Sequence, residues 1–269
     1  MQTEALAALG ERMGRHALPG FLGLLLVLLS VCAVLALALA HQRKAAAARG
    51  APDARLLLAG LAIGFASVIG LAALFAEISE GLGDGHPMGV FDEALSRSIG
   101  AHTPRAALRT FAWLTHLADP AWITLLCIGV AALLWRDRHR SIAIGWVLAV
   151  AGNAVLNTSL KRVFERARPV HDHELATASG FSFPSGHSSG AVVCYGMLAY
   201  LGWRLLPERY HLPATLVAAA IVLCTACSRV FLQVHYPSDV LAGLCSGLAW
   251  LCVCIGSTEW ARHRIAQRR

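Results

Sequence analysis

The stretch GFLGLLLVLLSVCAVLALALAH, residues 20–41, contains no Asp, Glu, Lys or Arg and is long enough to cross a lipid bilayer as one α-helix. Six further apolar segments of similar length follow it, and the centres of all seven lack these charged residues. They predict an all-α fold, a polytopic membrane helical bundle. The seven segments run over about residues 20–41, 56–78, 120–136, 141–162, 186–204, 212–229 and 236–256.

The composition supports a membrane protein and disfavours two other classes. Hydrophobic residues make up 57% of the chain and charged residues 14%, well below the quarter or so that is usual in soluble domains. The net charge of +7 sits mostly in short connections beside apolar segments, without a basic stripe interleaved with aromatics. This placement favours charges that orient helices over a nucleic-acid site.

The eight cysteines all lie inside apolar segments, where they can pack as small hydrophobic side chains. Cys224 and Cys227 form a C-x-x-C and Cys252 and Cys254 a C-x-C, but neither has a second pair or a nearby His at zinc-ligand spacing. We therefore expect no metal or redox role for them.

The basic connections predict the orientation in the membrane. Four groups of Lys and Arg fall on one side if the N-terminus is outside and the C-terminus is cytoplasmic. The outer side then receives the loop 79–119, where residues 91–100 and 105–119 are expected to form short interfacial helices. The four groups are Arg43, Lys44, Arg49 and Arg55; Arg136, Arg138 and Arg140; Arg204 and Arg209; and Arg262, Arg264, Arg268 and Arg269.

The first segment has a second interpretation as a cleaved signal peptide, because Ala38-Leu39-Ala40 resembles a cleavage site. Cleavage would invert every later connection and turn the basic groups outward. The apolar stretch of residues 20–41 exceeds the roughly 7–15 residues usual in signal peptides, which favours a retained extra helix.

Basic residues on the outer side form the first of three clusters. Lys161, Arg162, Arg166 and Arg168 follow the fourth segment, and Pro169 directs Arg168 into an extended loop. They fit either of two interpretations: long basic side chains at a helix end whose charges reach the membrane–water interface, or a binding site for an anionic group.

The second cluster, FPSGHSS over residues 183–189, immediately precedes the fifth segment. Ser185 is a plausible helix N-cap, and Gly186 permits a close backbone approach to a ligand at a helix terminus suited to anions. A bare capping motif would explain both residues, but it would leave His187 at a membrane edge unexplained.

The third cluster, SRVFLQVHYPSD over residues 228–239, joins the sixth and seventh segments. Pro237 suits a first helical turn, which places Asp239 four residues after His235 and within reach of its imidazole. An interfacial His with an incidental Asp is the alternative for this cluster taken alone.

The topology brings all three clusters to one face, and there the sequence resembles the type-2 phosphatidic acid phosphatase (PAP2) superfamily of membrane lipid phosphatases. The family signatures K-x6-R-P, P-S-G-H and S-R-x5-H-x3-D occur without a gap at Lys161 to Pro169, Pro184 to His187 and Ser228 to Asp239. The resemblance implies a six-helix core over residues 56–269. Residues 1–55 then form an N-terminal addition with the extra helix and a basic cytoplasmic loop.

The resemblance also implies roles at a metal-independent, cofactor-free phosphatase site. His235 would attack phosphorus to give a phosphohistidine, Asp239 would orient it, and His187 would protonate the leaving oxygen and then activate water. A neutral His235 and a protonated His187 are needed together, which predicts a bell-shaped pH dependence. The phosphate would be bound by Lys161, Arg168, Ser185, Gly186 and Arg229.

Three other functions are less well supported. A vanadate-dependent haloperoxidase fits poorly with seven membrane segments, and a transporter would place its polar groups near the midplane. A non-catalytic lipid-phosphate binding protein is disfavoured by the intact His235 and Asp239 pair. The sequence His171-Asp172-His173 could suggest a metal site, but alone it is a weak signal.

The lipid itself stays open. Undecaprenyl diphosphate, phosphatidylglycerol phosphate, phosphatidic acid and lipid A phosphates are all implied as candidates, as monophosphate or diphosphate. The Ala-rich and Leu-rich composition suggests a bacterial inner membrane, with the active site on the extracytoplasmic side.

Overall fold

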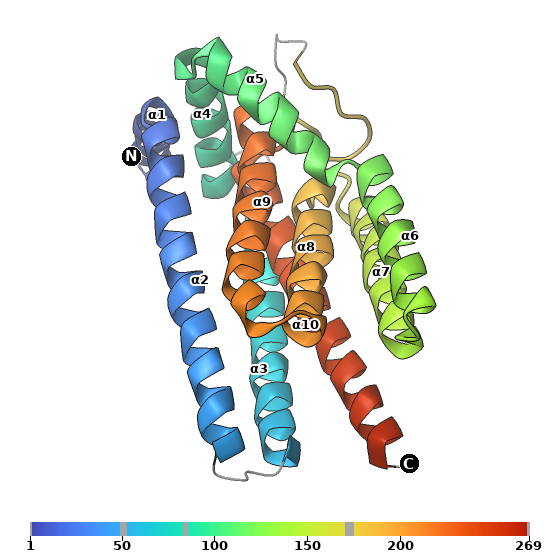
Figure 1. The fold of residues 1–269 in the computed structure, drawn as a ribbon. Coiled ribbons are helices and arrows are strands. Elements are labelled where there is room, and N and C mark those ends of the chain that lie inside the picture. Colours follow the sequence, from blue (N-terminus) through green and yellow to red (C-terminus); the bar gives the residue numbers. More distant parts are fainter. Residues whose placement is uncertain (1, 49–52, 83–85, 170–174, 268–269) are drawn as a thin grey trace.

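The computed structural model describes residues 2–48, 53–82, 86–169 and 175–267, and within them it is all α-helical. Long helices run along the molecule, and α5 lies across its upper end (Figure 1). The elements are α1 (Gln2–Arg15), α2 (Ala17–Ala48), α3 (Asp53–Glu80), α4 (Pro87–His102), α5 (Arg105–Leu114), η1 (Thr115–Ala118), α6 (Pro120–Arg136), α7 (Arg140–Phe164), α8 (Gly186–Leu205), η2 (Glu208–Tyr210), α9 (His211–Phe231) and α10 (Pro237–Gln267).

All seven predicted apolar segments are helical, but the count of seven membrane spans is not confirmed. Within the described residues, five helices are long and apolar enough to cross a membrane, and α6 qualifies only together with α5 and η1 as a pair bent by 43°. The helix α8 is not among the candidate spans. It begins with Gly-His-Ser-Ser and packs against α7, α9 and α10, so its polar first turn lies inside the bundle.

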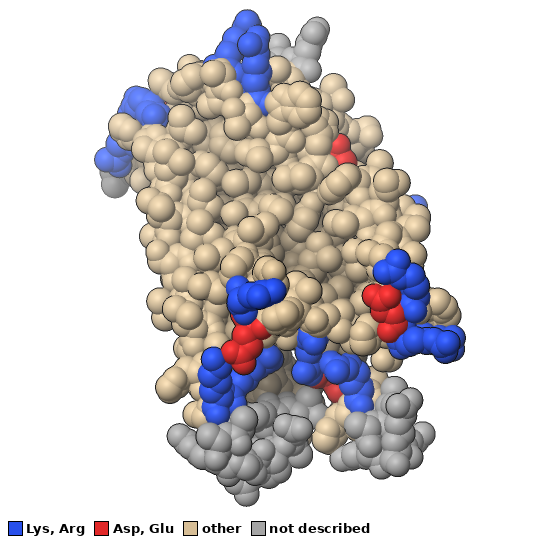
Figure 2. All heavy atoms as spheres, in the orientation of Figure 1, with Lys and Arg blue, Asp and Glu red and all other residues tan. Residues whose placement is uncertain are grey.

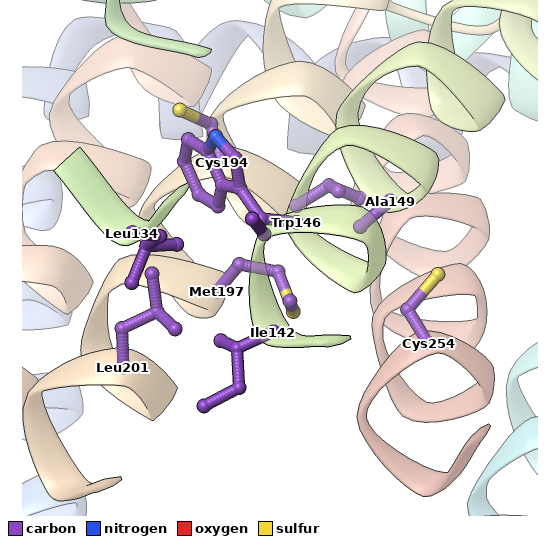
Figure 3. Close-up of a cluster of buried hydrophobic side chains, with 10 residues drawn as sticks. Leu134, Ile142, Trp146, Ala149, Cys194, Met197, Leu201 and Cys254 are labelled. Carbon is purple, nitrogen blue, oxygen red and sulfur yellow. The ribbon is translucent and has the colours of Figure 1, made fainter. Parts of the chain in front are cut away.

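One buried hydrophobic cluster lies among α6, α7, α8 and α10 (Figure 3). Trp146 and Met197 are fully buried there, and Trp146 Nε1 donates to the Cys127 carbonyl at 2.9 Å. By contrast, α2 and α3 bury almost none of their apolar side chains, which is what lipid-facing helices require. Figure 2 shows the result as a broad uncharged band with Lys and Arg gathered above and below it.

Three of the four predicted basic groups meet at one end of the bundle. Lys44 at the end of α2 forms a 2.8 Å ion pair with Glu208, and Arg43 stacks over the ring of Trp203 on α8. Nearby, Arg204 and Arg262 both contact Glu259 of α10.

The opposite end carries the short helices. The two predicted in the loop 79–119 are confirmed as α4 and as α5 with η1. The helix α1 was not predicted, because it is short and not apolar enough to stand out as a span. It packs on α4, where Gly10 and Gly14 allow close approach and Ser98 Oγ donates to the Glu11 carbonyl at 2.8 Å.

Candidate active site

Four helix termini bring the three sequence clusters together at the α4 and α5 end of the bundle. Lys161 lies in the last turn of α7, and His187 in the first turn of α8. Arg229 lies in the last turn of α9, and Asp239 in the first turn of α10. His235 stands on the short connection between α9 and α10.

His235 and Asp239 are buried and face each other. His235 Nδ1 lies 3.4 Å from Asp239 Oδ2, across the first turn of α10. Ser182 Oγ lies 3.2 Å from the same imidazole nitrogen and also donates to Asp239 Oδ2. The Tyr236 N–H donates to this oxygen at 2.8 Å, so the carboxylate is fixed in place.

The contacts of His235 define which of its nitrogens carries the proton. Arg168 NH1 lies 3.0 Å from His235 Nε2. A guanidinium is always a donor, so Nε2 accepts and the proton of the neutral ring is on Nδ1, facing Asp239 and Ser182. This tautomer presents the Nε2 lone pair toward the cationic side of the site.

The pKa of His235 agrees with a neutral ring. Burial disfavours the imidazolium and lowers the pKa of His235 to about 3, although Asp239 acts in the opposite direction. Burial also lowers the pKa of Arg168 from its usual high value, with Asp239 opposing the shift. Arg168 stays protonated because a guanidinium does not lose its proton in proteins.

Two of the predicted phosphate ligands converge on the segment before α8. Lys161 Nζ donates to the carbonyls of Phe181 and Ser182, and Arg168 donates to Phe181 at 3.0 Å. Both cations are therefore held by backbone carbonyls beside His235. A phosphate would add anionic acceptors to donors that are already positioned.

Arg229 approaches from α9 and is almost fully buried. Its NH1 donates to Thr115 Oγ1 at 2.6 Å, whereas its Nε has no hydrogen-bond partner within the described part of the chain. A buried guanidinium with an unpaired donor fits a site that receives an anion.

Ser185 and Gly186 form the start of α8, as the sequence predicts. Ser185 Oγ caps the helix by accepting from the Ser188 N–H at 3.4 Å, and the Ser185 N–H donates to the Asp239 carbonyl at 2.9 Å. A Cβ on Gly186 would lie 2.9 Å from Asn157 Oδ1, so this turn packs tightly against α7. The side chain of Ser185 thus serves the helix cap, and its predicted contact with phosphate stays a prediction.

His187 has a partner that sequence reasoning missed. Its Nε2 lies 3.0 Å from Asp119 Oδ1, and the second oxygen of Asp119 lies 2.6 Å from His116 Nδ1. Asp119 precedes α6 at its N-cap position. An Asp-Pro pair before an apolar segment is a helix-start signal, but it does not indicate contact with residue 187.

The polar residues of the fourth segment also find partners on α8. Asn157 Nδ2 donates to Ser189 Oγ at 3.3 Å and to the Pro184 carbonyl at 3.4 Å. Asn153 Nδ2 lies 3.4 Å from the same hydroxyl. Both amides of α7 are thus received by α8 and by the residue Pro184 that precedes it.

An outer layer of polar contacts surrounds the His235 and Asp239 pair. Arg166 NH1 donates to Asp239 Oδ1 at 2.7 Å, and Arg166 NH2 donates to Asp92 Oδ2 at 2.8 Å. Asp92 belongs to α4, far from the three signatures in sequence. The predicted metal-like sequence His171-Asp172-His173 lies outside the described residues.

An all-α membrane bundle with two histidines, a buried carboxylate and three cations at one end has the groups that phosphoryl transfer through a histidine requires. Comparison with known proteins points the same way. The PAP2 superfamily model matches residues 142–262, which contain every predicted site residue.

Named relatives and a solved structure extend this match. Phosphatidylglycerophosphatase B of Bacillus subtilis (strain 168) is 31% identical over 159 residues, covering 58% of this chain and 78% of that protein. Lipid A 1-phosphatase of Rhizobium etli is 31% identical over 175 residues, covering 55% of this chain and 71% of that protein. The crystal structure of a transmembrane PAP2-type phosphatidylglycerolphosphate phosphatase from Bacillus subtilis superposes with a TM-score of 0.67 and 27% identity, covering 72% of this chain and 96% of that one.

The chain belongs to the PAP2 superfamily. Its homologues indicate a phosphoric ester hydrolase.

Proposed function

We propose that this protein hydrolyses a phosphomonoester or diphosphate of a membrane lipid through a phosphohistidine intermediate, without a metal ion. The observation that carries the proposal is the state of His235. It is buried, its Nδ1–H faces Asp239, and its Nε2 lone pair is directed toward Arg168 and the other cations. A neutral imidazole held in this tautomer is a nucleophile ready for attack at phosphorus.

In the first step His235 Nε2 forms a bond to phosphorus as the bond from phosphorus to the leaving oxygen breaks. The ring becomes cationic, and Asp239 stabilises it through the Nδ1–H. His187 gives a proton to the leaving oxygen, which departs as the lipid alcohol or, from a diphosphate, as the lipid monophosphate.

In the second step the roles of His187 reverse. It accepts a proton from water as the water oxygen attacks phosphorus, and the bond to His235 Nε2 breaks. Inorganic phosphate leaves and both imidazoles return to their starting states. Asp119 supports this role because its Oδ1 lies 3.0 Å from His187 Nε2, where a carboxylate stabilises the protonated imidazole.

Lys161, Arg168 and Arg229 would stabilise the charge that spreads over the phosphoryl oxygens, and Gly186 at the start of α8 would add its N–H. Arg168 has a second task. Because it donates to His235 Nε2 in the free protein, it must shift to the phosphoryl oxygens when substrate binds, which frees the nucleophile.

The substrate class follows from the position of the site and from the relatives. The site lies at one end of the apolar band, where a lipid head group reaches a membrane-embedded protein (Figures 1 and 2). Two relatives are named for phosphomonoesters of membrane lipids, phosphatidylglycerophosphate and lipid A. We place phosphatidylglycerol phosphate first among the candidate substrates. We propose the extracytoplasmic face of a bacterial inner membrane as the location of the site.

The direct test is phosphate release by the purified protein in detergent. The panel contains phosphatidylglycerol phosphate, lipid A, phosphatidic acid and undecaprenyl diphosphate, each with and without EDTA. We expect at least one lipid to be hydrolysed in EDTA, and we expect His235→Ala to lose turnover by about 10³-fold or more, since the nucleophile is gone.

A trapping experiment separates the mechanism from the activity. Rapid acid-free quenching with ³²P-labelled substrate should label the wild-type protein with a base-stable, acid-labile phosphate, the signature of phosphohistidine. Hydrolysis that persists in His235→Ala would refute the assigned nucleophile, and activity abolished by EDTA and restored by a divalent cation would refute metal independence.

A further inference from the structure

The buried carboxylate Asp92 is tied to the nucleophile through one arginine. Asp239 turns Oδ2 toward His235, while its Oδ1 accepts from Arg166 NH1 at 2.7 Å. The other terminal nitrogen of Arg166 donates to Asp92 Oδ2 at 2.8 Å. The guanidinium thus bridges two carboxylates, one in direct contact with the nucleophile and one on a different helix.

Asp92 is built into this position by α4. Asp92, Leu95 and Ile99 are buried at helical spacing, so they form the face of α4 that points into the protein. The carboxylate meets the N-terminus of α10, where Oδ1 accepts the Ser238 N–H at 3.2 Å and Oδ2 accepts the Ser238 hydroxyl. A carboxylate at a helix N-terminus is stabilised by the unpaired N–H groups there.

The environment of Arg166 makes these contacts strong. Burial alone would lower the pKa of Arg166, but Asp239 and Asp92 outweigh it and raise that pKa. The guanidinium carbon also lies 4.4 Å from the centroid of the Tyr236 ring, which covers one face. Burial raises the pKa of Asp92 overall, and the hydrogen bond from Ser238 and the guanidinium of Arg166 act against that rise by favouring the carboxylate.

We propose that Asp92 and Arg166 are positioning residues for the phosphohistidine chemistry, acting through Asp239. Asp92 neutralises Arg166, and Asp239 therefore keeps its full negative charge for the imidazolium that forms at His235. This inference rests on the proposed function. It assigns a positioning role to a residue of α4, which lies outside the region that the family model matches. It assigns the same role to Arg166, which lies between Lys161 and Arg168 in the first signature.

The charge balance explains why both residues matter. On the Nδ1 side of His235, Asp239, Arg166 and Asp92 together leave one net negative charge, while Arg168 lies on the Nε2 side. That negative charge faces the nitrogen that carries the proton when the ring becomes cationic during attack. Without Asp92, Arg166 would keep its contacts with the Ser238 hydroxyl and Asp239, and its positive charge would be balanced by the Asp239 carboxylate at the expense of the imidazole. Without Arg166, Asp239 would lose the donor that fixes Oδ1, and Asp92 would be left buried without its cation.

The test is a double-mutant cycle in the lipid hydrolysis assay. We expect Asp92→Asn to lower kcat about tenfold with KM changed less than twofold, because the substrate does not touch Asp92. Arg166→Gln should lower kcat by at least as much. The double variant should lose about tenfold less than the product of the single losses, since groups in one hydrogen-bond network are coupled.

Glu93→Gln is the matched control, because Glu93 is the neighbour of Asp92 on α4 but is exposed and lies 4.0 Å from Arg97. It should keep wild-type kcat. Melting temperature and detergent elution profile establish that each variant is folded. If Asp92→Asn does not fold, Arg166→Lys replaces it. A lysine keeps the charge but lacks the planar guanidinium whose two terminal nitrogens each hold one carboxylate. Its kcat should fall while its KM stays.

The outcomes separate this inference from the proposed function. Wild-type protein without hydrolysis, or an active His235→Ala, would defeat the proposed function. The positioning role is judged once the wild type is active and His235→Ala is inactive. It would then be overturned alone if folded Asp92→Asn had the kcat of Glu93→Gln, or if the losses of the two single variants simply multiplied in the double variant. For the replacement variant, folded Arg166→Lys with wild-type kcat would overturn it.

Discussion

At the scale of single residues, the site depends on a histidine that must stay unprotonated to attack phosphorus. His235 has three neighbours that bear on its charge: Asp239 favours the cation, and Arg168 and Arg229 oppose it. Burial decides the balance and lowers the pKa of His235 to about 3. The nucleophile is therefore available across the whole range in which an exposed histidine would titrate.

This buried histidine makes stability depend on pH. In the unfolded chain His235 takes up a proton as the pH falls below about 6.5, while in the folded protein it does not until the pH approaches 3. Between these values the unfolded state binds more protons, so stability is full above about pH 6.5 and falls by up to about 1.4 kcal/mol per pH unit below it.

We expect the melting temperature in detergent to fall between pH 6.5 and pH 4.5, and we expect His235→Gln to flatten that slope. ¹⁵N NMR of histidine-labelled protein provides the direct measurement. The resonances of His235 should keep the pattern of the neutral Nδ1–H tautomer at pH 5. An imidazolium pattern at that pH would contradict the assigned environment, and the acid limb of the bell-shaped profile would then lie near pH 6.5.

Asp119 gives a second residue-scale prediction. Its carboxylate lies 3.0 Å from His187 Nε2, on the ring that is proposed to protonate the leaving oxygen. Asp119→Asn removes the charge that orients and supports this acid, and kcat with a lipid alcohol as leaving group should fall about tenfold or more. With p-nitrophenyl phosphate, whose leaving group needs no proton, the loss should be much smaller.

His116→Asn is the control for this prediction, because His116 contacts the other oxygen of Asp119 at 2.6 Å and its side chain is largely exposed. It should have a weaker effect than Asp119→Asn on both substrates. Equal losses with the two leaving groups in Asp119→Asn would mean that Asp119 holds the structure rather than the acid.

At the scale of helices, the site depends on how closely α10 approaches the start of α8. A Cβ on Gly243 would lie 2.5 Å from the Ser185 carbonyl oxygen and 3.1 Å from Ser188 Cβ. A backbone atom cannot move aside as a flexible side chain can, so Gly243→Ala must push the two helices apart. We expect a loss of about 1–3 kcal/mol in stability and reduced kcat, measured by thermal unfolding and phosphate release.

Gly129→Ala on α6 is the matched substitution, since a Cβ there meets no atom within 4 Å. It should keep activity and leave the melting temperature unchanged or slightly raised, because alanine favours the helix. If Gly243→Ala behaves in the same way, the close packing of α8 on α10 is not needed to hold Ser185 and Asp239 in place.

The helices and the chemistry were predictable from different signals. Apolar segments define α2, α3, α6, α7, α8, α9 and α10. The three signatures locate His187 and Asp239 in first helical turns and His235 just before α10. The short helix α1 was missed because its residues carry no span-like signal. Its stability comes from packing on α4, which a local pattern does not report.

The contacts that complete the site could not be predicted, because they join residues far apart in the chain. Arg166 meets Asp92 across 74 positions, and His187 meets Asp119 across 68. A single carboxylate on an amphipathic helix is more often a solvated residue than a buried one. Only the packing of α4 and α6 against the signature loops identifies these two as part of the site.

At the scale of the whole molecule, charge and fold define two unlike ends. One end holds the three basic groups that meet around Glu208 and Glu259. The other end holds α1, α4, α5 and the site. There Arg166 donates to a carboxylate and Arg168 to a backbone carbonyl, so these two cations serve the site and are not counted among the charges that orient the protein in the membrane. Excess basic residues in short connections mark the cytoplasmic side, so the site should face outward.

The orientation is testable with fusions in a bacterial host. Green fluorescent protein fused to the C-terminus should fluoresce and alkaline phosphatase at the same place should be inactive, because α10 ends at the basic end. Alkaline phosphatase fused after Gly81, at the α3 end that lies near the site helices, should be active. The reverse pattern would place the site in the cytoplasm, and that is the arrangement expected if residues 20–41 were a cleaved signal peptide. Observing the reverse pattern would therefore overturn both the prediction that the first span is retained and the proposal that the site faces the extracytoplasmic side. The phosphohistidine chemistry at His235 does not depend on this orientation, because phosphate release and phosphohistidine trapping test it separately.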